Sequence, residues 1–399
     1  MRRALSLLLC VGLLAGCLPL GGCGSLYSNY REVEQLRVMQ TLGLDDAPGG
    51  VTVTLAAAAD PAGGAPPCFS AAGASVSAAI EAARQRSVEE DLFTGHLRQV
   101  LVGEAAARRS LEPILTFICR SPDVRLDMPL FILRDCTARE VMTEAGSGER
   151  GISEILQAAH GRLDAQAGGH VFTAGELLRS VERRGSGLVC ALRYGPASES
   201  GGAPDAGEGA ASGANAAEPP YTTAAFGGYA VIRGGALCEF LDPDAALGVD
   251  FLLNTVGIRE LVVRDRFGAP VTLEIARGGT RLQPLWNEDG SLRGIEIYAS
   301  VTASLLETGG ALSAVESADY LTGQLEAAVS DRIGAALWLA RTLETDYLGL
   351  RDRVEQAAPL RARRLETDLG ALLPALELSI AVRGELSHSH DLEGGGAPS

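Results

Sequence analysis

The most regular hydrophobic pattern in the chain lies toward its C-terminal end, where apolar residues recur every three or four positions. The stripe consists of Leu321, Leu325, Val329, Ile333, Leu337 and Ala340. This spacing places all of these side chains on one face of an α-helix. We expect the helix to pack that face onto the sheet of its own domain, as layered α+β folds require. The alternative is that the stripe is a binding face for a partner.

The rest of the second half shows the patterns of β-strands. Residues 271–275 alternate apolar and polar side chains as a half-buried strand does, and turn residues at 287–290 lead into a second strand at 295–301. Together they predict a long hairpin. A shorter hairpin is predicted at 228–233 and 236–240, a short helix at 244–253 and a final strand at 376–383.

The first half mixes the two periodicities. Strands are predicted at 36–44, 51–55, 96–102 and 130–133, and helices at 76–86 and in a segment that runs through residue 117. Two T-x-x-E sequences, at 137–140 and 173–176, are capping boxes. In a capping box the threonine oxygen and the glutamate side chain satisfy free amides at a helix start, so two further helices should begin there.

Composition divides the chain. Residues 196–225 are acidic and rich in Ala, Gly, Ser and Pro, with almost nothing to bury, which predicts a flexible linker. A smaller Ala/Gly/Pro-rich patch at 56–67 predicts a loop between a strand and a helix. We therefore expect a signal segment at 1–16, an N-terminal α+β region at 17–195, the linker at 196–225, a C-terminal domain at 226–392 and a disordered tail at 393–399.

These elements predict a multidomain α+β fold. Mixed and antiparallel sheets should pack with helices, and the C-terminal domain should place its long helix on a β-sheet.

The N-terminus resembles that of an exported, lipid-modified protein. Two arginines precede the apolar run at 5–15, which is too short to cross a membrane as a helix. The sequence LAGC at 14–17 matches the bacterial lipobox, in which the cysteine thiol receives diacylglycerol. We assign Cys17 as the lipid attachment site because the apolar run ends there, with Cys23 in a second, weaker match as the alternative. The competing interpretation is an ordinary signal peptide in which these cysteines are merely apolar residues.

Charge and cysteine spacing limit the partners and cofactors that the chain is expected to bind. The formal net charge is −16, and no basic cluster interleaved with aromatic residues stands out, so we expect no nucleic-acid partner. The cysteines beyond the N-terminus show neither a C-x-x-C pair nor the spacing of a zinc site, so we predict no metal and no cofactor. Export permits disulfides, but the sequence selects no pair, and free thiols are the expectation.

The motifs of common enzymes are absent from the sequence. It contains no G-x-S-x-G, no H-E-x-x-H and no glycine-rich phosphate loop after a strand, so we predict that the chain is not an enzyme. We interpret His96 as an interior histidine bonded to backbone, and Glu104 as a structural carboxylate in a first helical turn. His388 and His390 could share a metal but are interpreted as solvated residues of the tail.

Several short motifs occur in a fixed order along nearly the whole chain. They are REV at 31–33, LGLD at 42–45, LFTGH at 92–96, GE at 103–104, FICRSPDVR at 117–125, GYAVI at 228–232 and DYLG at 346–349. In this order they resemble the Ger(x)C family of spore germination lipoproteins, the C subunits of germinant receptors. The family usually has Trp followed by Asp or Asn after the lipidated cysteine, and here neither Cys17 nor Cys23 is followed by Trp.

The resemblance implies an α+β protein without catalytic activity, in which 226–392 is the germination-protein C domain. It leaves open whether the N-terminal region is one domain or two. It also implies a lipoprotein on the outer face of the spore inner membrane that assembles with integral membrane A and B subunits into a nutrient-sensing receptor. Composition and spacing indicate neither these partners nor the nutrient.

Two other functions would predict different features of the chain. A solute-binding lipoprotein of a membrane transporter predicts two similar α/β lobes around a cleft, whereas the two halves here are unlike. A cell-wall hydrolase needs paired carboxylates or a zinc site, and the sequence contains no such arrangement.

Overall fold

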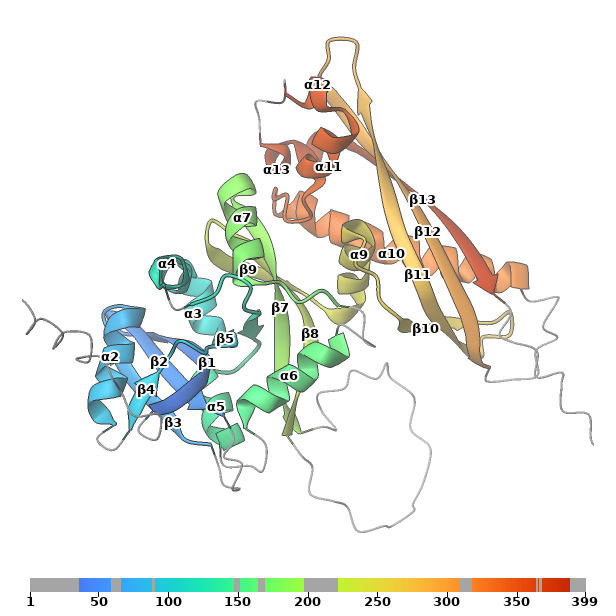
Figure 1. Ribbon diagram of the computed structural model, residues 1–399. Coiled ribbons are helices and arrows are strands. Elements are labelled where there is room, and N and C mark those ends of the chain that lie inside the picture. Colours follow the sequence, from blue (N-terminus) through green and yellow to red (C-terminus); the bar gives the residue numbers. More distant parts are fainter. Residues whose placement is uncertain are drawn as a thin grey trace, which may run out of the picture.

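The structure is a computed structural model in which two sheet-based units lie end to end (Figure 1). It describes residues 36–58, 66–87, 90–122, 124–146, 151–163, 169–196, 222–308, 318–363, 365 and 368–387. Several predicted features lie outside these ranges: the signal segment, both candidate lipid attachment sites Cys17 and Cys23, residues 197–221 of the linker, and the tail with His388 and His390.

The first unit contains a nine-stranded mixed sheet in the order β3-β2-β1-β5-β6-β7-β8-β9, with β4 beside β1. Strands β1, β5, β6 and β7 are parallel, and antiparallel strands complete the sheet on both sides. Its strands are β1 (Leu36–Ala47), β2 (Gly50–Ala57), β3 (Cys68–Gly73), β4 (Asp91–Phe93), β5 (Gln99–Val102), β6 (Leu130–Leu133), β7 (Ser186–Pro196), β8 (Thr222–Arg233) and β9 (Ala236–Leu241).

Helices cover both faces of this sheet. One face carries α2 (Val76–Arg86), α3 (Glu104–Arg109), α4 (Glu112–Arg120) and α7 (Ala174–Arg184), and the opposite face carries α5 (Ala138–Gly146) and α6 (Ile152–Arg162). Every residue of β5 and β6 is buried as a result. Parallel strands covered on both sides are expected to be mostly apolar, and here Gln99 is the one polar residue of β5 and β6. Its side-chain amide donates hydrogen bonds to Thr41 and Ser153.

The second unit has a four-stranded sheet in the order β10-β11-β12-β13, in which β12 and β13 are parallel. Its strands are β10 (Arg259–Arg264), β11 (Pro270–Trp286), β12 (Leu292–Thr308) and β13 (Glu377–Ser387). Its helices are α9 (Pro243–Leu253), α10 (Ala318–Thr342), α11 (Leu350–Ala357), α12 (Pro359–Ala362) and α13 (Leu369–Leu372), followed by the 3-10 turn η4 (Leu373–Ala375).

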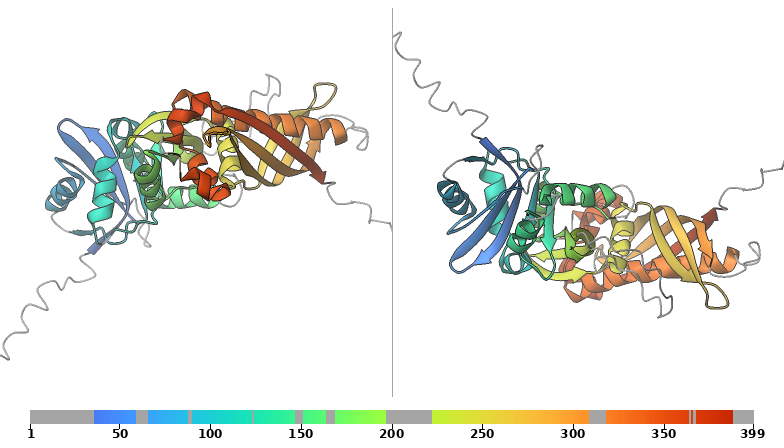
Figure 2. Two further views of the ribbon diagram at one scale, coloured as in Figure 1. Left: turned by 90° about the horizontal axis from the view of Figure 1, so that it is seen from above. Right: turned by 90° about the horizontal axis from the view of Figure 1, so that it is seen from below.

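The long helix α10 lies along one face of the second sheet (Figure 2). All six residues of its apolar stripe are buried there. This confirms both the predicted helix and the expectation that it packs onto its own domain, and it confirms the predicted α+β class.

Other elements differ from the sequence predictions. Strands β3, β4, β7 and β10 were not predicted. Strand β3 occupies part of the stretch between β2 and α2 that was expected to lead from a loop straight into a helix. The predicted hairpin at 228–240 is present as β8 and β9, but it extends the first sheet and does not begin the second. Strand β5 begins at Gln99, so His96 precedes it.

The linker region falls between two neighbouring strands of one sheet. Strands β7 and β8 pair from Ser186↔Arg233 to Pro196↔Thr222, so the two ends of the intervening segment lie side by side. A long insertion between paired strand ends leaves the sheet intact, because the entropy of closing a loop rises only slowly with its length.

Candidate functional site: the junction of the two sheets

Strand β8 belongs to two hydrophobic cores at once. Tyr229 and Val231 face the core of the second unit, whereas Ala230 and Ile232 face the core beneath α3, α4 and α7. This follows from the alternation of side chains along a strand. The two units therefore share a strand, and their relative position is set by packing as well as by the chain connection.

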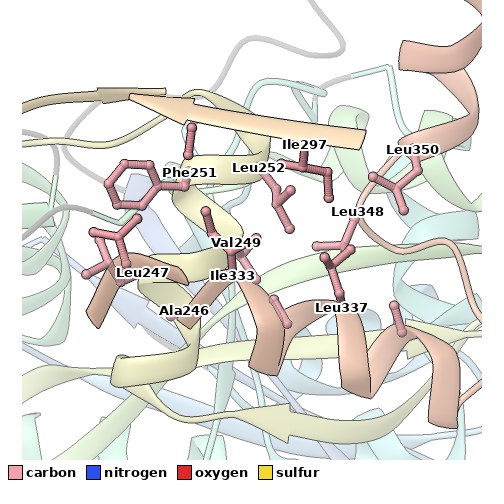
Figure 3. Close-up of a cluster of buried hydrophobic side chains, with 14 of the residues drawn as sticks. Ala246, Leu247, Val249, Phe251, Leu252, Ile297, Ile333, Leu337, Leu348 and Leu350 are labelled. Carbon is pink, nitrogen blue, oxygen red and sulfur yellow. The ribbon is translucent and has the colours of Figure 1, made fainter. Parts of the chain in front are cut away.

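Helix α9 is the element that the second unit places against β8. Its apolar residues meet those of α10, β12 and the segment before α11, as Figure 3 shows for Ala246, Leu247, Val249, Phe251, Leu252, Ile297, Ile333, Leu337, Leu348 and Leu350. A carboxyl group sits inside this apolar helix, because Asp250 is fully buried. A buried carboxyl group requires partners or protonation.

The partners of Asp250 come from both units. The Tyr229 hydroxyl donates a hydrogen bond to Asp250 Oδ1 at 2.5 Å, and the backbone N–H of His170 donates to the same hydroxyl at 2.6 Å. On the other side, a guanidinium nitrogen of Arg259 lies 3.4 Å from Asp250 Oδ2. That oxygen accepts no hydrogen bond from the described residues.

Burial dominates the electrostatics of this group. Desolvation raises the pKa of Asp250 to about 7, against the opposing effects of the Arg259 charge and the Tyr229 hydrogen bond. Burial, the nearby carboxyl and the hydrogen bond to it raise the pKa of Tyr229 well above its usual value, so the phenol remains a donor. The pKa of Arg259 is lowered by burial, but an arginine stays charged in proteins.

Aromatic rings surround the Tyr229 hydrogen bonds. Phe172 and Phe226 meet the Tyr229 ring edge-on, with ring centroids 5.5 Å and 5.4 Å apart. His170 packs edge-on against Phe172 and lies 3.4 Å from a carboxylate oxygen of Glu176. Glu176 also completes the predicted capping box with Thr173. The His170 and Thr173 hydrogen bonds lower the pKa of Glu176 to about 2, despite its partial burial.

A second polar contact joins the units at the C-terminal end of α7. Arg184 forms an ion pair with Asp352 in the first turn of α11, and Arg183 reaches the other oxygen of Asp352 at 2.9 Å. Arg183 also lies 3.6 Å from Glu355. We call Arg183, Arg184 and Asp352 the inter-unit clamp.

The DYLG motif builds the start of α11 that the clamp uses. Asp346 accepts hydrogen bonds from the N–H groups of Leu350 at 2.8 Å and Arg351 at 2.9 Å. Tyr347 donates to the carbonyl of Ala336 on α10 at 2.7 Å, and Gly349 has a φ of 68°, which glycine adopts without strain. Burial raises the pKa of Asp346 to about 6, although both amide bonds favour its charged form.

The motifs of the first unit build a similar cap. Asp45 accepts hydrogen bonds from the N–H groups of Ala138 at 2.7 Å and Arg139 at 2.8 Å, at the start of α5. A Cβ at Gly103 would lie only 2.2 Å from Asp45 Oδ1. The glycine of the GE motif, which has no Cβ, therefore leaves room for the aspartate carboxylate of the LGLD motif. Both motifs therefore act on one helix start.

Two individual predictions for the first half have different outcomes. Glu104 is structural as predicted: it pairs with Arg108 at 2.8 Å and accepts the Asp135 N–H at 2.8 Å. His96 is exposed and packs edge-on against Phe93, so its assignment to the interior was wrong. Its position in the turn before β5, outside the strand, explains the error.

Several expectations about chemistry can be placed only in the described part of the chain. Cys68, Cys119, Cys136, Cys190 and Cys238 are all free there. The same residues contain no group of three or more His, Cys, Asp or Glu side chains arranged to hold a metal ion. None of the described helices is long and apolar enough to cross a membrane.

Few of the junction residues belong to a sequence motif; Thr173 and Glu176 form the predicted capping box. Tyr229 and Asp346 belong to the GYAVI and DYLG motifs, whereas Asp250, Arg259 and the clamp belong to none. A signal for Asp250 existed, because it interrupts the apolar run at 245–253 inside a predicted helix.

The geometry defines a class of protein: two unlike α+β units that share a hydrophobic core and are joined by polar contacts. Comparison with known proteins agrees. The model of the spore germination protein N-terminal domain matches residues 29–188, and that of the spore germination B3/GerAC-like C-terminal domain matches residues 227–389. The chain belongs to the Ger(x)C family of spore germination proteins.

One solved structure shows how far the fold extends. The crystal structure of the GerBC protein is 17% identical, with a TM-score of 0.55 over 89% of this chain and 99% of that one. Similarity at this identity concerns the fold, and it covers both units together. No curated protein sequence matches the chain.

Proposed function

We propose that this chain is the lipid-anchored, non-catalytic C subunit of a spore germinant receptor, needed for nutrient-triggered germination. The observation that carries the proposal is the match of both family domains in order along one chain, with a fold similar to that of GerBC over both units. The hydrophobic core shared by the two units supports a role in assembly, because it would hold their surfaces in one relative position.

The proposed partners are the integral membrane A and B subunits of the receptor, on the outer face of the spore inner membrane. To test this, the tagged protein is purified from detergent-solubilised spore membranes, and co-purifying proteins are identified by mass spectrometry. We expect two polytopic subunits encoded beside it. Recovery of a transporter permease in their place would overturn the proposal in favour of a solute-binding lipoprotein.

We propose that diacylglycerol on Cys17 holds the chain at the membrane. The lipobox at 14–17 supports this, and two acyl chains anchor stably because each buried CH₂ contributes about 0.8 kcal/mol. Metabolic labelling with an alkyne fatty acid should mark the native chain and Cys23→Ala, and should fail to mark Cys17→Ala. Label that survives in Cys17→Ala and disappears in Cys23→Ala would assign the lipid to Cys23.

A further inference from the structure

An apolar groove lies between α10 and β13, on the side of the second unit away from α9. We call it the α10–β13 groove. It has a volume of about 420 Å³, and its walls include Gly334, Leu337, Trp338, Arg341, Leu378 and Ile380. Trp338 is 65% exposed beside it, although α10 is otherwise amphipathic with its apolar stripe buried. A large exposed aromatic side chain next to a groove is typical of a binding surface.

One wall of the groove is a strand edge. In the described part of the chain, β13 is the last strand of its sheet and pairs only with β12 (Figure 2). The N–H of Gly384 donates to the carboxylate of Glu326 on α10 at 2.8 Å, so it points away from β12. Because backbone groups alternate in direction along a strand, the N–H and C=O groups of Leu378 and Ile380 also point toward that edge.

This combination specifies the chemistry of an occupant. Backbone N–H and C=O groups at a strand edge are satisfied by a second extended polypeptide, while lipid tails offer neither donor nor acceptor. Among the described residues that line the groove, Arg341 is the only one with a charged side chain, so a carboxylate on the occupant would complement it. A second copy of this chain is disfavoured, because two chains of net charge −16 repel.

We propose that the α10–β13 groove binds an extended extramembrane segment of an integral membrane subunit of the receptor, which adds a strand to β13. Apolar side chains of the segment fill the space beside Trp338, and a carboxylate meets Arg341. The inference rests on the proposed function, since it names the surface through which that assembly forms.

Two glycines of α10 provide a matched pair of variants. A Cβ at Gly334 meets only Ile380 Cδ1, at 3.9 Å, and a Cβ at Gly323 meets nothing within 4 Å, so a side chain can begin at either position without a backbone clash. Leu at 334 fills the groove, and Leu at 323 projects from another part of the same helix. In spore-membrane purifications, Gly334→Leu should lower recovery of the polytopic subunits at least about tenfold, and Gly323→Leu by less than about twofold.

Trp338→Ala is a second, independent variant. Leu360→Ala is its control, because Leu360 is also a large exposed hydrophobic residue but is not among the residues that line the groove. Trp338→Ala should reduce recovery and Leu360→Ala should not. If all four variants recover the polytopic subunits as well as the native chain does, the α10–β13 groove is not their binding site, and the proposed function still stands. Absence of polytopic subunits from the native purification overturns both.

Cross-linking identifies the occupant directly. A photoreactive Trp338→benzoylphenylalanine chain should form a covalent adduct with a peptide of a membrane subunit when spores are irradiated, and the same substitution at Leu360 should not. An adduct only with a second copy of the chain, or only with lipid, overturns the proposal.

Discussion

The two sheets of the molecule differ in how much of their surface the protein itself covers. In the first sheet, helices lie on both faces, and the central strands are buried along their whole length. In the second, β12 alternates: Ile297 and Ala299 are buried beneath helices, whereas Tyr298 and Ser300 are exposed. A sheet with one open face and an open edge has surface available to a partner, so the second unit is the better candidate for assembly contacts.

The two units nevertheless use the same device to start a helix. Asp45 in the first unit and Asp346 in the second each accept two successive backbone N–H groups, and both are buried. Asp250 differs from both, because its partners include a phenol and a guanidinium from different elements. The caps are local structure, whereas Asp250 lies where the two units meet.

The largest expected effect comes from separating α9 and α10, which together cover the inner face of the second sheet. A Cβ at Gly248 would lie 2.0 Å from the carbonyl oxygen of Arg332, a backbone atom of α10 that cannot move aside alone. Gly248→Ala should therefore lower the free energy of unfolding by about 3 kcal/mol, toward the upper end for overpacking. Urea denaturation measures this.

Hydrogen exchange shows which unit is affected. Amide protection should fall in β11 and β12 and persist in β5 and β6 if the first sheet keeps its own cores. The control is Gly323→Ala, where the added methyl has open space and should not destabilise. A loss of protection that is equal in both sheets would show that the shared strand makes them one cooperative unit.

The sequence predicts the elements with strong periodicity and misses strands that are short or lack a clear alternation. The buried stripe of α10 and the alternation at 271–275 and 295–301 are local signals, so the helix and the hairpin were predicted. The two strands of the hairpin are longer than predicted, at 17 residues each. Strands β4 and β10 are short, and β3 follows directly on a patch rich in Ala, Gly and Pro. That β8 joins the first sheet depends on its pairing with β7 across the linker, which no local pattern reveals.

The sequence predicts less of the candidate site than of the fold. Tyr229 and Asp346 could be noticed as motif residues, but their roles depend on Asp250 and on the start of α11. The clamp is composed of arginines and an aspartate that look like ordinary solvated residues along the chain. Only folding brings Arg184 to Asp352, which lies 168 positions further along the chain.

A smaller effect should appear in the pH dependence of stability, through Asp250. Its folded pKa of about 7 lies above the ordinary value of 3.8, so the native state binds the proton more tightly than the unfolded state. The stabilisation is fully present below the unfolded pKa and is lost as the pH rises through the folded pKa. Between pH 5 and 7 the free energy of unfolding should fall by about 2 kcal/mol on this account.

Asp250→Asn should abolish this part of the pH profile, because the amide keeps an acceptor for Tyr229 and does not titrate. Asp244→Asn on the same helix is the control, since the Asp244 side chain is 84% exposed. The measurement is chemical denaturation at pH 5 and pH 7 for the three chains. Parallel pH profiles for native protein and Asp250→Asn would show that Asp250 does not hold a proton at the junction.

The smallest expected effect comes from mutating the inter-unit clamp. The experiment tests whether this ion pair, in addition to packing, holds the two units together. Arg184 and Asp352 are largely buried, with side-chain exposures of 13% and 26%, so a double-mutant cycle with Arg184→Met and Asp352→Asn should give a coupling energy of about 1 kcal/mol. The Arg125–Asp127 pair within the first unit is exposed and should give close to zero. If the clamp also gives zero, the relative position of the two sheets depends on the packing of α9 against β8 and on the Tyr229–Asp250 hydrogen bond. A measurable coupling that persists in high salt would mean instead that the partly buried ion pair helps to fix the covered sheet against the half-covered one.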